Sequence, residues 1–305
     1  MMNGSLTESA VLAEGLVKSY GKVKALGGVS LDVRHGETFG IIGPDGAGKS
    51  TLFRLLTSLL VPDSGSAQVE GLDTVKDYRE IRKIIGYMPG KFSLYQDLTV
   101  EENLTFFATL FGTTIDENYH LIEDIYKQIE PFKARMAGKL SGGMKQKLAL
   151  CCALIHKPKV LFLDEPTTGV DPVSRKEFWD MLGRLKNDGI TILVSTPYMD
   201  EAGRCDRIAL IRNGKFLTVN SPAGIIAEFP DRLYSVRSDR MHALLGDLRA
   251  YSGTIRAFSF GESMHLSTGD GFSEDDLRKF LQDRKHNNVE INAIRPSVED
   301  CFMRI

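Results

Sequence analysis

Hydrophobic and polar residues alternate or cluster along the N-terminal part of the chain in ways that predict strands. Residues 11–19 and 29–33 alternate, which is typical of strands with one buried face. The dipeptide Asn213-Gly214 separates two further apolar segments and favours a tight β-hairpin. Residues 160–163 are apolar throughout, as expected of a parallel strand buried on both faces. Residues 39–42 form a further apolar run, and residues 191–196 predict another buried strand.

Helical spacing of apolar residues marks an insert between these strands. Thr99 is a suitable N-cap, with Glu102 at the position that completes a capping box. Residues 104–111 then place their apolar side chains on one helical face, and residues 116–129 repeat the pattern. We therefore expect a helical subdomain at about residues 91–150 within an otherwise strand-rich domain.

From about Arg232 the pattern changes to short strands and helices in the order β-α-β-β-α-β, which is that of a split βαβ module. Ser297 is placed to cap a final helix, with Asp300 at the third helical position. The expected fold class is α/β, with a mixed sheet and the helical subdomain in residues 1–230. A small α+β domain is expected in residues 231–305.

Composition narrows the class of protein. With 305 residues, 42% apolar and 26% charged, the chain is typical of a globular protein of two domains. Its net charge of -2 gives no basic excess, so we expect no binding of nucleic acid. The N-terminus is polar and no apolar run reaches the length of a membrane span. We therefore expect a soluble cytoplasmic chain that needs another subunit to act at a membrane.

The cysteines form no C-x-x-C pair, and the two adjacent ones could not bridge each other without strain. Buried thiols in a reducing compartment are the expected state of Cys151, Cys152, Cys205 and Cys301.

The segment Gly43–Thr51 carries the strongest chemical signal. It fits G-x-x-x-x-G-K-[ST] and joins the apolar run 39–42 to a helical segment. Glycines between a strand and a helix let several backbone N–H groups and the positive helix end point at one place, which suits phosphate. Lys49 would reach the β- and γ-phosphates, and the Ser50 hydroxyl would hold Mg²⁺.

Two carboxylates follow the buried run 160–163, at the strand end where ligands bind in open α/β sheets. Asp164 could hold Mg²⁺ directly or through water, and Glu165 could polarise an attacking water. A charged strand end is common by itself, but the phosphate loop upstream favours the catalytic interpretation.

Two weaker signals accompany these motifs. Ser141-Gly142-Gly143 offers N–H groups and a hydroxyl to an anion at a helix start, yet taken alone it is better explained as an ordinary helix cap. Tyr20, next to a turn, could stack on adenine, although surface packing is the commoner role of a lone tyrosine.

Taken together, these motifs resemble those of ATP-binding cassette ATPases over roughly residues 11–229. Several motifs in the order and spacing of one family are more specific than any single motif. The matching segments are 43–51 for the Walker A motif, 140–143 for the signature, 161–166 for the Walker B motif with its catalytic glutamate, and 169–171 for the D-loop.

Residues 92–104 and 295–300 look most like the ATPase subunits of ABC-2 type exporters. This resemblance implies ATP and Mg²⁺ as ligands, an integral membrane permease as partner, and attachment through it to the cytoplasmic face of the cell membrane. It also implies a second cassette, identical or different, that closes head to tail so that each signature contacts the ATP held by the other subunit. The implied roles are catalysis for Glu165, metal binding for Ser50 and Asp164, and nucleotide contacts for Tyr20, Gly43, Asp45, Gly46, Ala47, Gly48, Lys49, Ser50, Thr51, Ser141, Gly142 and Gly143.

The chain departs from the family pattern at two catalytic positions. Gly90 stands where the family has a glutamine that reaches the metal and the attacking water, and Pro197 stands where it has a histidine that donates to the γ-phosphate. Neither residue can supply these groups. Gln96 lies in another loop segment and His156 precedes the Walker B strand, so we expect neither to compensate. The resulting hypothesis is a site that binds MgATP but hydrolyses it slowly, with an intact signature that completes a competent site on a second cassette.

A smaller departure is Asp45, where the family commonly has asparagine; we expect its carboxylate to point outward. The alternative function is that of a soluble cassette protein with a regulatory role outside transport. The absence of a second cassette, a coiled coil or a basic extension in the sequence favours the exporter subunit.

Overall fold

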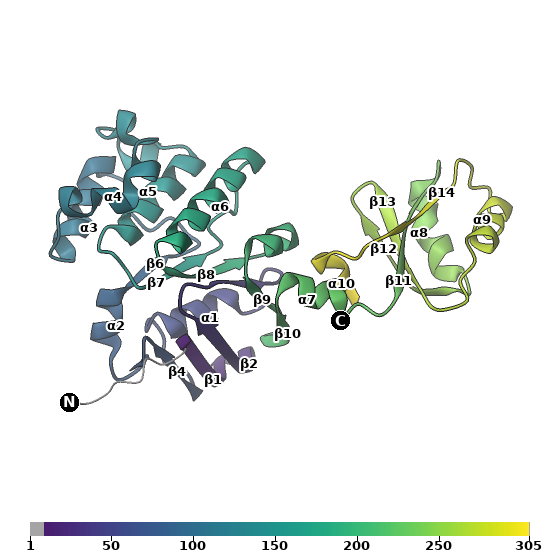
Figure 1. Cartoon of the computed structure of the whole chain (residues 1–305), viewed down its shortest axis with the longest axis horizontal. Coiled ribbons are helices and arrows are strands. Elements are labelled where there is room, and N and C mark those ends of the chain that lie inside the picture. Colours follow the sequence, from purple (N-terminus) through teal and green to yellow (C-terminus); the bar gives the residue numbers. More distant parts are fainter. Residues whose placement is uncertain (1–8, 305) are drawn as a thin grey trace. The chain divides into compact units, whose positions relative to one another are not determined.

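The computed structural model describes residues 9–304, which form two compact units (Figure 1). The first unit extends to Pro222 and the second begins at Ala223. This division precedes the boundary expected at residue 230, because helix α7 (Pro222–Ala227) packs with the second unit. There the Cys301 thiol donates to the Ile225 carbonyl oxygen at 3.5 Å.

A six-stranded sheet forms the centre of the first unit, with the order β10-β9-β3-β8-β7-β6. All neighbouring strands are parallel except β9 and β10, which form the hairpin predicted at Asn213-Gly214. The carboxyl ends of β3, β7 and β8 therefore lie at one edge, where a ligand site is expected. The strands are β3 (Thr38–Ile42), β6 (Ile85–Met88), β7 (Val160–Asp164), β8 (Thr191–Thr196), β9 (Arg207–Arg212) and β10 (Lys215–Asn220).

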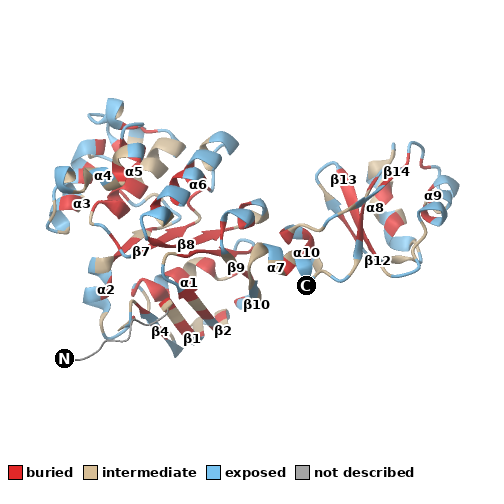
Figure 2. Ribbon diagram, in the orientation of Figure 1, coloured by how far each residue is buried: buried red, intermediate tan, exposed pale blue. Residues whose placement is uncertain are grey.

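A second, antiparallel sheet has the order β2-β1-β4-β5 and covers helix α1 (Lys49–Leu56) from the other side. Figure 2 shows the buried layer between the two sheets in red. Phe53 of α1 meets Phe162 of β7 edge to face, with ring centroids 5.8 Å apart. This packing fixes the start of α1 against the central sheet. The strands are β1 (Ser9–Tyr20), β2 (Val23–Arg34), β4 (Ser64–Val69) and β5 (Leu72–Asp73).

The predicted helical insert is present, and Thr99 and Glu102 form the predicted capping box at its first helix. The helix expected over residues 116–129 ends earlier, at Tyr126, and a short 3-10 turn that contains Pro131 follows. Ile129 is nevertheless buried, as its spacing predicts. The helices of the first unit are α2 (Tyr78–Ile84), α3 (Val100–Leu110), α4 (Ile115–Tyr126), α5 (Gly142–Leu154) and α6 (Pro172–Asn187).

The second unit has the predicted β-α-β-β-α-β order, and its sheet has the order β12-β13-β11-β14 with every pair antiparallel. Leu266 and Leu281 are among the buried residues between this sheet and its two helices. Ser297 and Asp300 form the predicted cap of the final helix. The elements are β11 (Arg232–Arg237), α8 (Met241–Ala250), β12 (Thr254–Phe260), β13 (Ser263–Thr268), α9 (Glu274–Asp283), β14 (Glu290–Ile294) and α10 (Val298–Arg304).

Two expectations about the chain as a whole can be compared with the structure. Within residues 9–304, no helix has the length and apolar character needed to cross a membrane. All the cysteines are buried free thiols, and burial raises the pKa of the Cys301 thiol to about 11. At neutral pH these sulfurs are therefore protonated and unreactive.

Candidate nucleotide-binding site

The Gly43–Thr51 segment forms a tight loop between β3 and α1, as its sequence predicts. A Cβ atom at Gly43 would lie 2.1 Å from the Ile211 carbonyl oxygen. Gly48 caps α1 with φ of 107°, a left-handed conformation that favours glycine. The first turn of α1 contains no acidic residue and Gly48 supplies no capping side chain, so its N–H groups remain available to an anion.

Lys49 is held inside this loop, with its side chain 2% exposed. Its Nζ donates to the carbonyl oxygens of Gly43 at 2.7 Å and Pro44 at 3.0 Å, and lies 3.0 Å from Glu165 Oε1. The Asp45 carboxylate is 4.0 Å away but 88% exposed, so it points outward as expected. A cation held beside the free N–H groups at the start of a helix can bind phosphate.

The two carboxylates lie at the end of β7, held by a residue of the neighbouring strand. Ser195 of β8 donates its hydroxyl to Asp164 Oδ1 at 2.6 Å, and its Oγ accepts from the Glu165 N–H at 3.0 Å. Glu165 has φ of 51°, which is rare for a residue with a side chain. Strained backbone of this kind is often found at functional sites. Sequence reasoning did not identify Ser195 as part of the site.

A pocket of about 400 Å³ joins these groups. Tyr20, 46% exposed, lies at it together with the phosphate loop and Glu165. The hairpin turn Asn213-Gly214, which the sequence marked only as a turn, also lines it, because the Gly214 N–H donates to the Ala47 carbonyl oxygen at 2.9 Å. The full lining is Tyr20, Val23, Lys24, Ala25, Gly46, Gly48, Lys49, Ser50, Thr51, Glu165, Asn213 and Gly214.

A divalent cation would have few protein ligands here. Among residues 9–304 no cluster of three His, Cys, Asp or Glu side chains could hold a metal alone. The Ser50 hydroxyl lines the pocket, and Asp164 is a 3% exposed carboxylate at the adjoining strand end. Mg²⁺ is commonly bound by one or two protein groups together with substrate phosphates, and this donor set fits that pattern.

The residues Ser141, Gly142 and Gly143 lie outside the lining of this pocket. Ser141 is exposed and caps α5, its Oγ accepting from the Met144 N–H at 3.4 Å. The structure thus separates the signature segment from the phosphate loop of the same chain.

The groups that could replace the missing glutamine and histidine lie elsewhere. The Gln96 carbonyl oxygen accepts from the Gly138 N–H at 2.9 Å, which fixes this residue in the helical insert. His156 Nε2 is 2.9 Å from the Ile85 carbonyl oxygen, and its ring stacks on Phe111 at 3.8 Å. Neither Gln96 nor His156 lines the nucleotide pocket.

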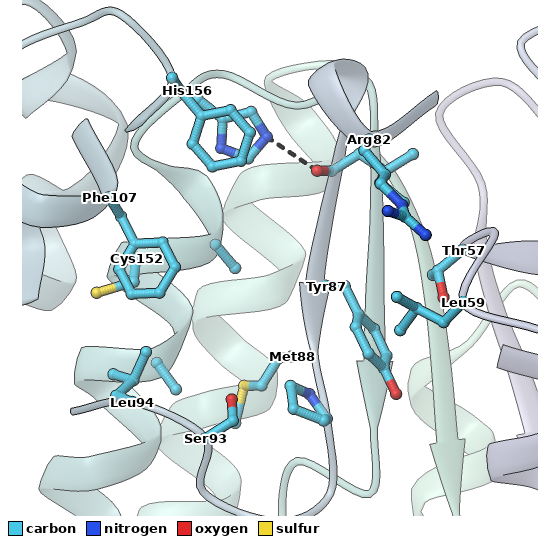
Figure 3. Close-up of a pocket in the computed structure, with 15 residues that line it drawn as sticks. Thr57, Leu59, Arg82, Tyr87, Met88, Ser93, Leu94, Phe107, Cys152 and His156 are labelled. Carbon is cyan, nitrogen blue, oxygen red and sulfur yellow. Dashed lines mark hydrogen bonds between the residues drawn. The ribbon is translucent and has the colours of Figure 1, made fainter. Parts of the chain in front are cut away.

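A separate groove of about 240 Å³ lies between the helical insert and the β6 edge of the central sheet (Figure 3). Phe107 and Cys152 form one wall, while Tyr87 and Met88 form the other. Burial, and then the nearby Asp164 carboxylate, raises the pKa of Tyr87 to about 12, so its phenol is neutral. Arg82 is the one lining residue with a permanent charge.

Comparison with known proteins places the motifs in a family. Residues 26–168 match the ABC transporter family. The Probable multidrug ABC transporter ATP-binding protein YbhF of Escherichia coli (strain K12) is 37% identical to this chain over 98% of the chain's length. The chain spans about half of that protein, 52% of its length. The Nod factor export ATP-binding protein I of Rhizobium sp. (strain N33) is 34% identical over 98% of this chain and 98% of its own length.

Solved structures agree with the fold of the first unit. The bacterial ABC transporter cassette MJ0796, solved as a dimer and also with ADP and phosphate, has a TM-score of 0.63 and 26% identity over 69% of this chain and 98% of its own. The expected cassette fold is thus confirmed, and these relatives do not support a regulatory role outside transport. The chain therefore belongs to the ABC transporter family.

Proposed function

We propose that the chain energises an export transporter by binding MgATP in the pocket at the phosphate loop and closing on a second cassette. The observation that carries the proposal is the enclosure of Lys49, Ser50 and Glu165 in one pocket with Tyr20 at its rim. Glycines Gly43, Gly46 and Gly48, with Ala47 and Thr51, complete the cradle around the phosphates. Asp45 borders this cradle from its exposed position.

Each residue has a distinct part in this chemistry. Lys49 would exchange its bond to Glu165 for the β- and γ-phosphates, which frees the carboxylate to accept a proton from water. Ser50 and Asp164 would hold Mg²⁺, which supplies positive charge to the phosphate oxygens when bound. Tyr20 would stack on the adenine ring.

The chain's own site is proposed to turn over slowly. Gly90 has no side chain and Pro197 has neither a side-chain donor nor an N–H, so two groups that act on the transition state are missing. Glu165 remains present, which leaves a slow reaction possible. Ser141, exposed and outside this pocket, would instead bind the ATP of the second cassette together with Gly142 and Gly143.

The groove of Figure 3 is the proposed docking site for a separate permease. Its lining includes an exposed apolar side chain, that of Leu59, which is 49% exposed. Exposed apolar surface beside a groove favours a protein partner. Docking there would place the chain on the cytoplasmic face of the membrane, with the first unit, to Pro222, as the cassette and the second unit, from Ala223, as an accessory domain.

Equilibrium binding of MgATP to the purified chain, followed by hydrolysis assays with and without permease and second cassette, tests this proposal. We expect the chain alone to bind MgATP and to hydrolyse it far more slowly than the complete complex. Absence of binding would contradict the nucleotide assignment, and full-rate hydrolysis by the chain alone would contradict the slow-site assignment.

A further inference from the structure

Arg175, on the first turns of α6, contacts three residues of the segment that follows β8. Its guanidinium lies over the Tyr198 ring, 4.1 Å from the centroid. It also forms ion pairs with Asp200 at 3.1 Å and Glu201 at 3.0 Å. The segment that begins at Pro197, where the family histidine is missing, is thereby fastened to α6.

Glu201 extends these contacts into the protein interior. It is 3% exposed, so a carboxylate here requires partners for both oxygens. Its Oε1 accepts from Thr167 Oγ1 at 2.8 Å and from Arg175 Nε at 3.1 Å. Its Oε2 accepts from Thr196 Oγ1 at 2.6 Å. Both threonines are buried, so this end of the network is shielded from water.

Each threonine connects this network to the nucleotide site. Thr167 is two residues beyond Glu165, in the turn whose Thr168 N–H donates to the Glu165 carbonyl oxygen at 3.2 Å. Thr196 ends β8, and its carbonyl oxygen accepts from the N–H of Gly43 at 3.2 Å. The network therefore ends at the backbone of Glu165 and at Gly43, the first residue of the phosphate cradle.

We propose that Arg175 is a positioning residue that transmits occupation of the nucleotide pocket to α6. Binding that displaces Lys49 from Glu165 changes the turn at residues 165–168, and Glu201 passes this change to Arg175. Because Arg175 lies one turn after the N-cap Asp171, the turn at residues 169–171 moves with it. The inference rests on the proposed binding of MgATP, but not on the proposed slow turnover.

The chain contains its own reporter for this motion. Trp179 is the only tryptophan in the sequence and lies one helical turn after Arg175. It lines a cavity of about 190 Å³ together with Arg175, Asp200 and Glu201. Trp179 is 5% exposed, so its emission responds to the charges of this network.

The experiment compares Trp179 emission with ATP binding measured separately by equilibrium dialysis, using the full chain. Arg175→Met removes the guanidinium group that contacts Tyr198, Asp200 and Glu201. Arg175→Lys keeps the positive charge but lacks the planar guanidinium with its several donors. Arg204→Met is the matched control, because Arg204 lines the same cavity and also joins this segment to α6, through Asp180 at 3.0 Å, but its side chain is 45% exposed and its ion pair is with Asp180 rather than Glu201.

We expect MgATP to change Trp179 emission in the wild-type chain and in Arg204→Met. Arg175→Met should lose this change and keep the wild-type dissociation constant, and Arg175→Lys should restore part of it. An unchanged response in Arg175→Met, or no response in a wild-type chain that binds ATP, would overturn the inference. Should Arg175→Met fail to fold, a full response in Arg175→Lys would overturn it as well. A wild-type chain that binds no ATP would contradict the proposed function itself.

Discussion

Lys49 and Glu165 form an ion pair across the candidate site, with 3.0 Å between Nζ and Oε1. In the proposed function both groups act elsewhere during phosphoryl transfer, the lysine on the phosphates and the glutamate on the attacking water. The pair thus stabilises the two side chains next to each other before nucleotide arrives. Nucleotide binding must exchange it for contacts with phosphate.

Lys49→Met should weaken MgATP binding by about tenfold or more. A hydrogen bond to a charged group contributes about 1.5–3 kcal/mol, and 1.4 kcal/mol corresponds to a factor of ten. Lys83→Met is the matched control, since Lys83 pairs with Glu80 on α2 and is 66% exposed. Isothermal titration calorimetry measures both variants. Equal affinities in the two would show that Lys49 does not contact the phosphates.

Tyr20→Ala should weaken ATP binding by several fold, whereas Tyr20→Phe should retain it. Aromatic pairs contribute about 0.5–1.5 kcal/mol beyond burial of their area, and the contribution belongs to the ring rather than to the hydroxyl. Competition with inorganic triphosphate, which has no base, separates stacking from phosphate contacts. If Tyr20→Ala weakened triphosphate binding equally, the stacking role would be wrong.

Gly90→Gln combined with Pro197→His should speed ATP hydrolysis by the chain's own site. One preorganised donor at a transition state contributes about 10² or more in rate. A steric cost at position 90 opposes this gain in rate, because a Cβ atom there would lie 3.1 Å from the Asp164 carbonyl oxygen. Gly90→Ala combined with Pro197→His carries this steric cost without the amide. If the single-turnover rates of ATP hydrolysis did not differ between the two double variants, the missing glutamine would not be a cause of slow hydrolysis.

Leu59→Glu should weaken association with a permease and leave ATP binding intact. Leu59 is 49% exposed at the groove of Figure 3, so folding tolerates the change, while burying the new carboxylate against a partner is costly. The control is Ile255→Glu, at a residue of the second unit that is 50% exposed. Co-purification from membranes provides the measurement. Loss of the permease in both variants, or in neither, would argue against this groove as the docking site.

Acid should destabilise the first unit partly through His156. Burial lowers the pKa of His156, so the unfolded chain takes up a proton near pH 6.5 before the folded chain does. Stability from the neutral ring is thus present above about pH 6.5 and is lost as the pH falls below it, by at most about 1.4 kcal/mol per pH unit. Calorimetric melting at about pH 7.5 and pH 5.5 should show a larger loss in wild type than in His156→Gln. An equal loss of stability in the two proteins would mean that groups other than His156 cause the destabilisation by acid.

The sequence motifs predicted the cradle and the carboxylates because each lies within one short segment. Strand periodicity and buried runs predicted β3, β7 and β8, and the Thr99–Glu102 capping box predicted the start of α3. Gly48 and Gly43 could be placed because a strand-to-helix turn needs left-handed backbone and close approach there.

Other parts of the site depend on contacts between distant segments. Ser195 reaches Asp164 only because β7 and β8 are parallel neighbours in register. Gly214 reaches the phosphate loop because the hairpin folds back onto Ala47. The association of α7 with the second unit depends likewise on a contact with α10. Local propensity carries no information about such pairings.

The contributions of this chain's own nucleotide pocket and of its signature segment, residues 140–143, can be measured separately in the complete complex of this chain, a second cassette and a permease. Ser141→Ala removes a group proposed to act on the partner's ATP, and Glu165→Gln removes the proposed base of the chain's own site. We predict that Ser141→Ala lowers the steady-state ATPase rate of the complex much more than Glu165→Gln does. A complex in which Glu165→Gln is the more damaging change would show instead that this chain's own site performs the hydrolysis.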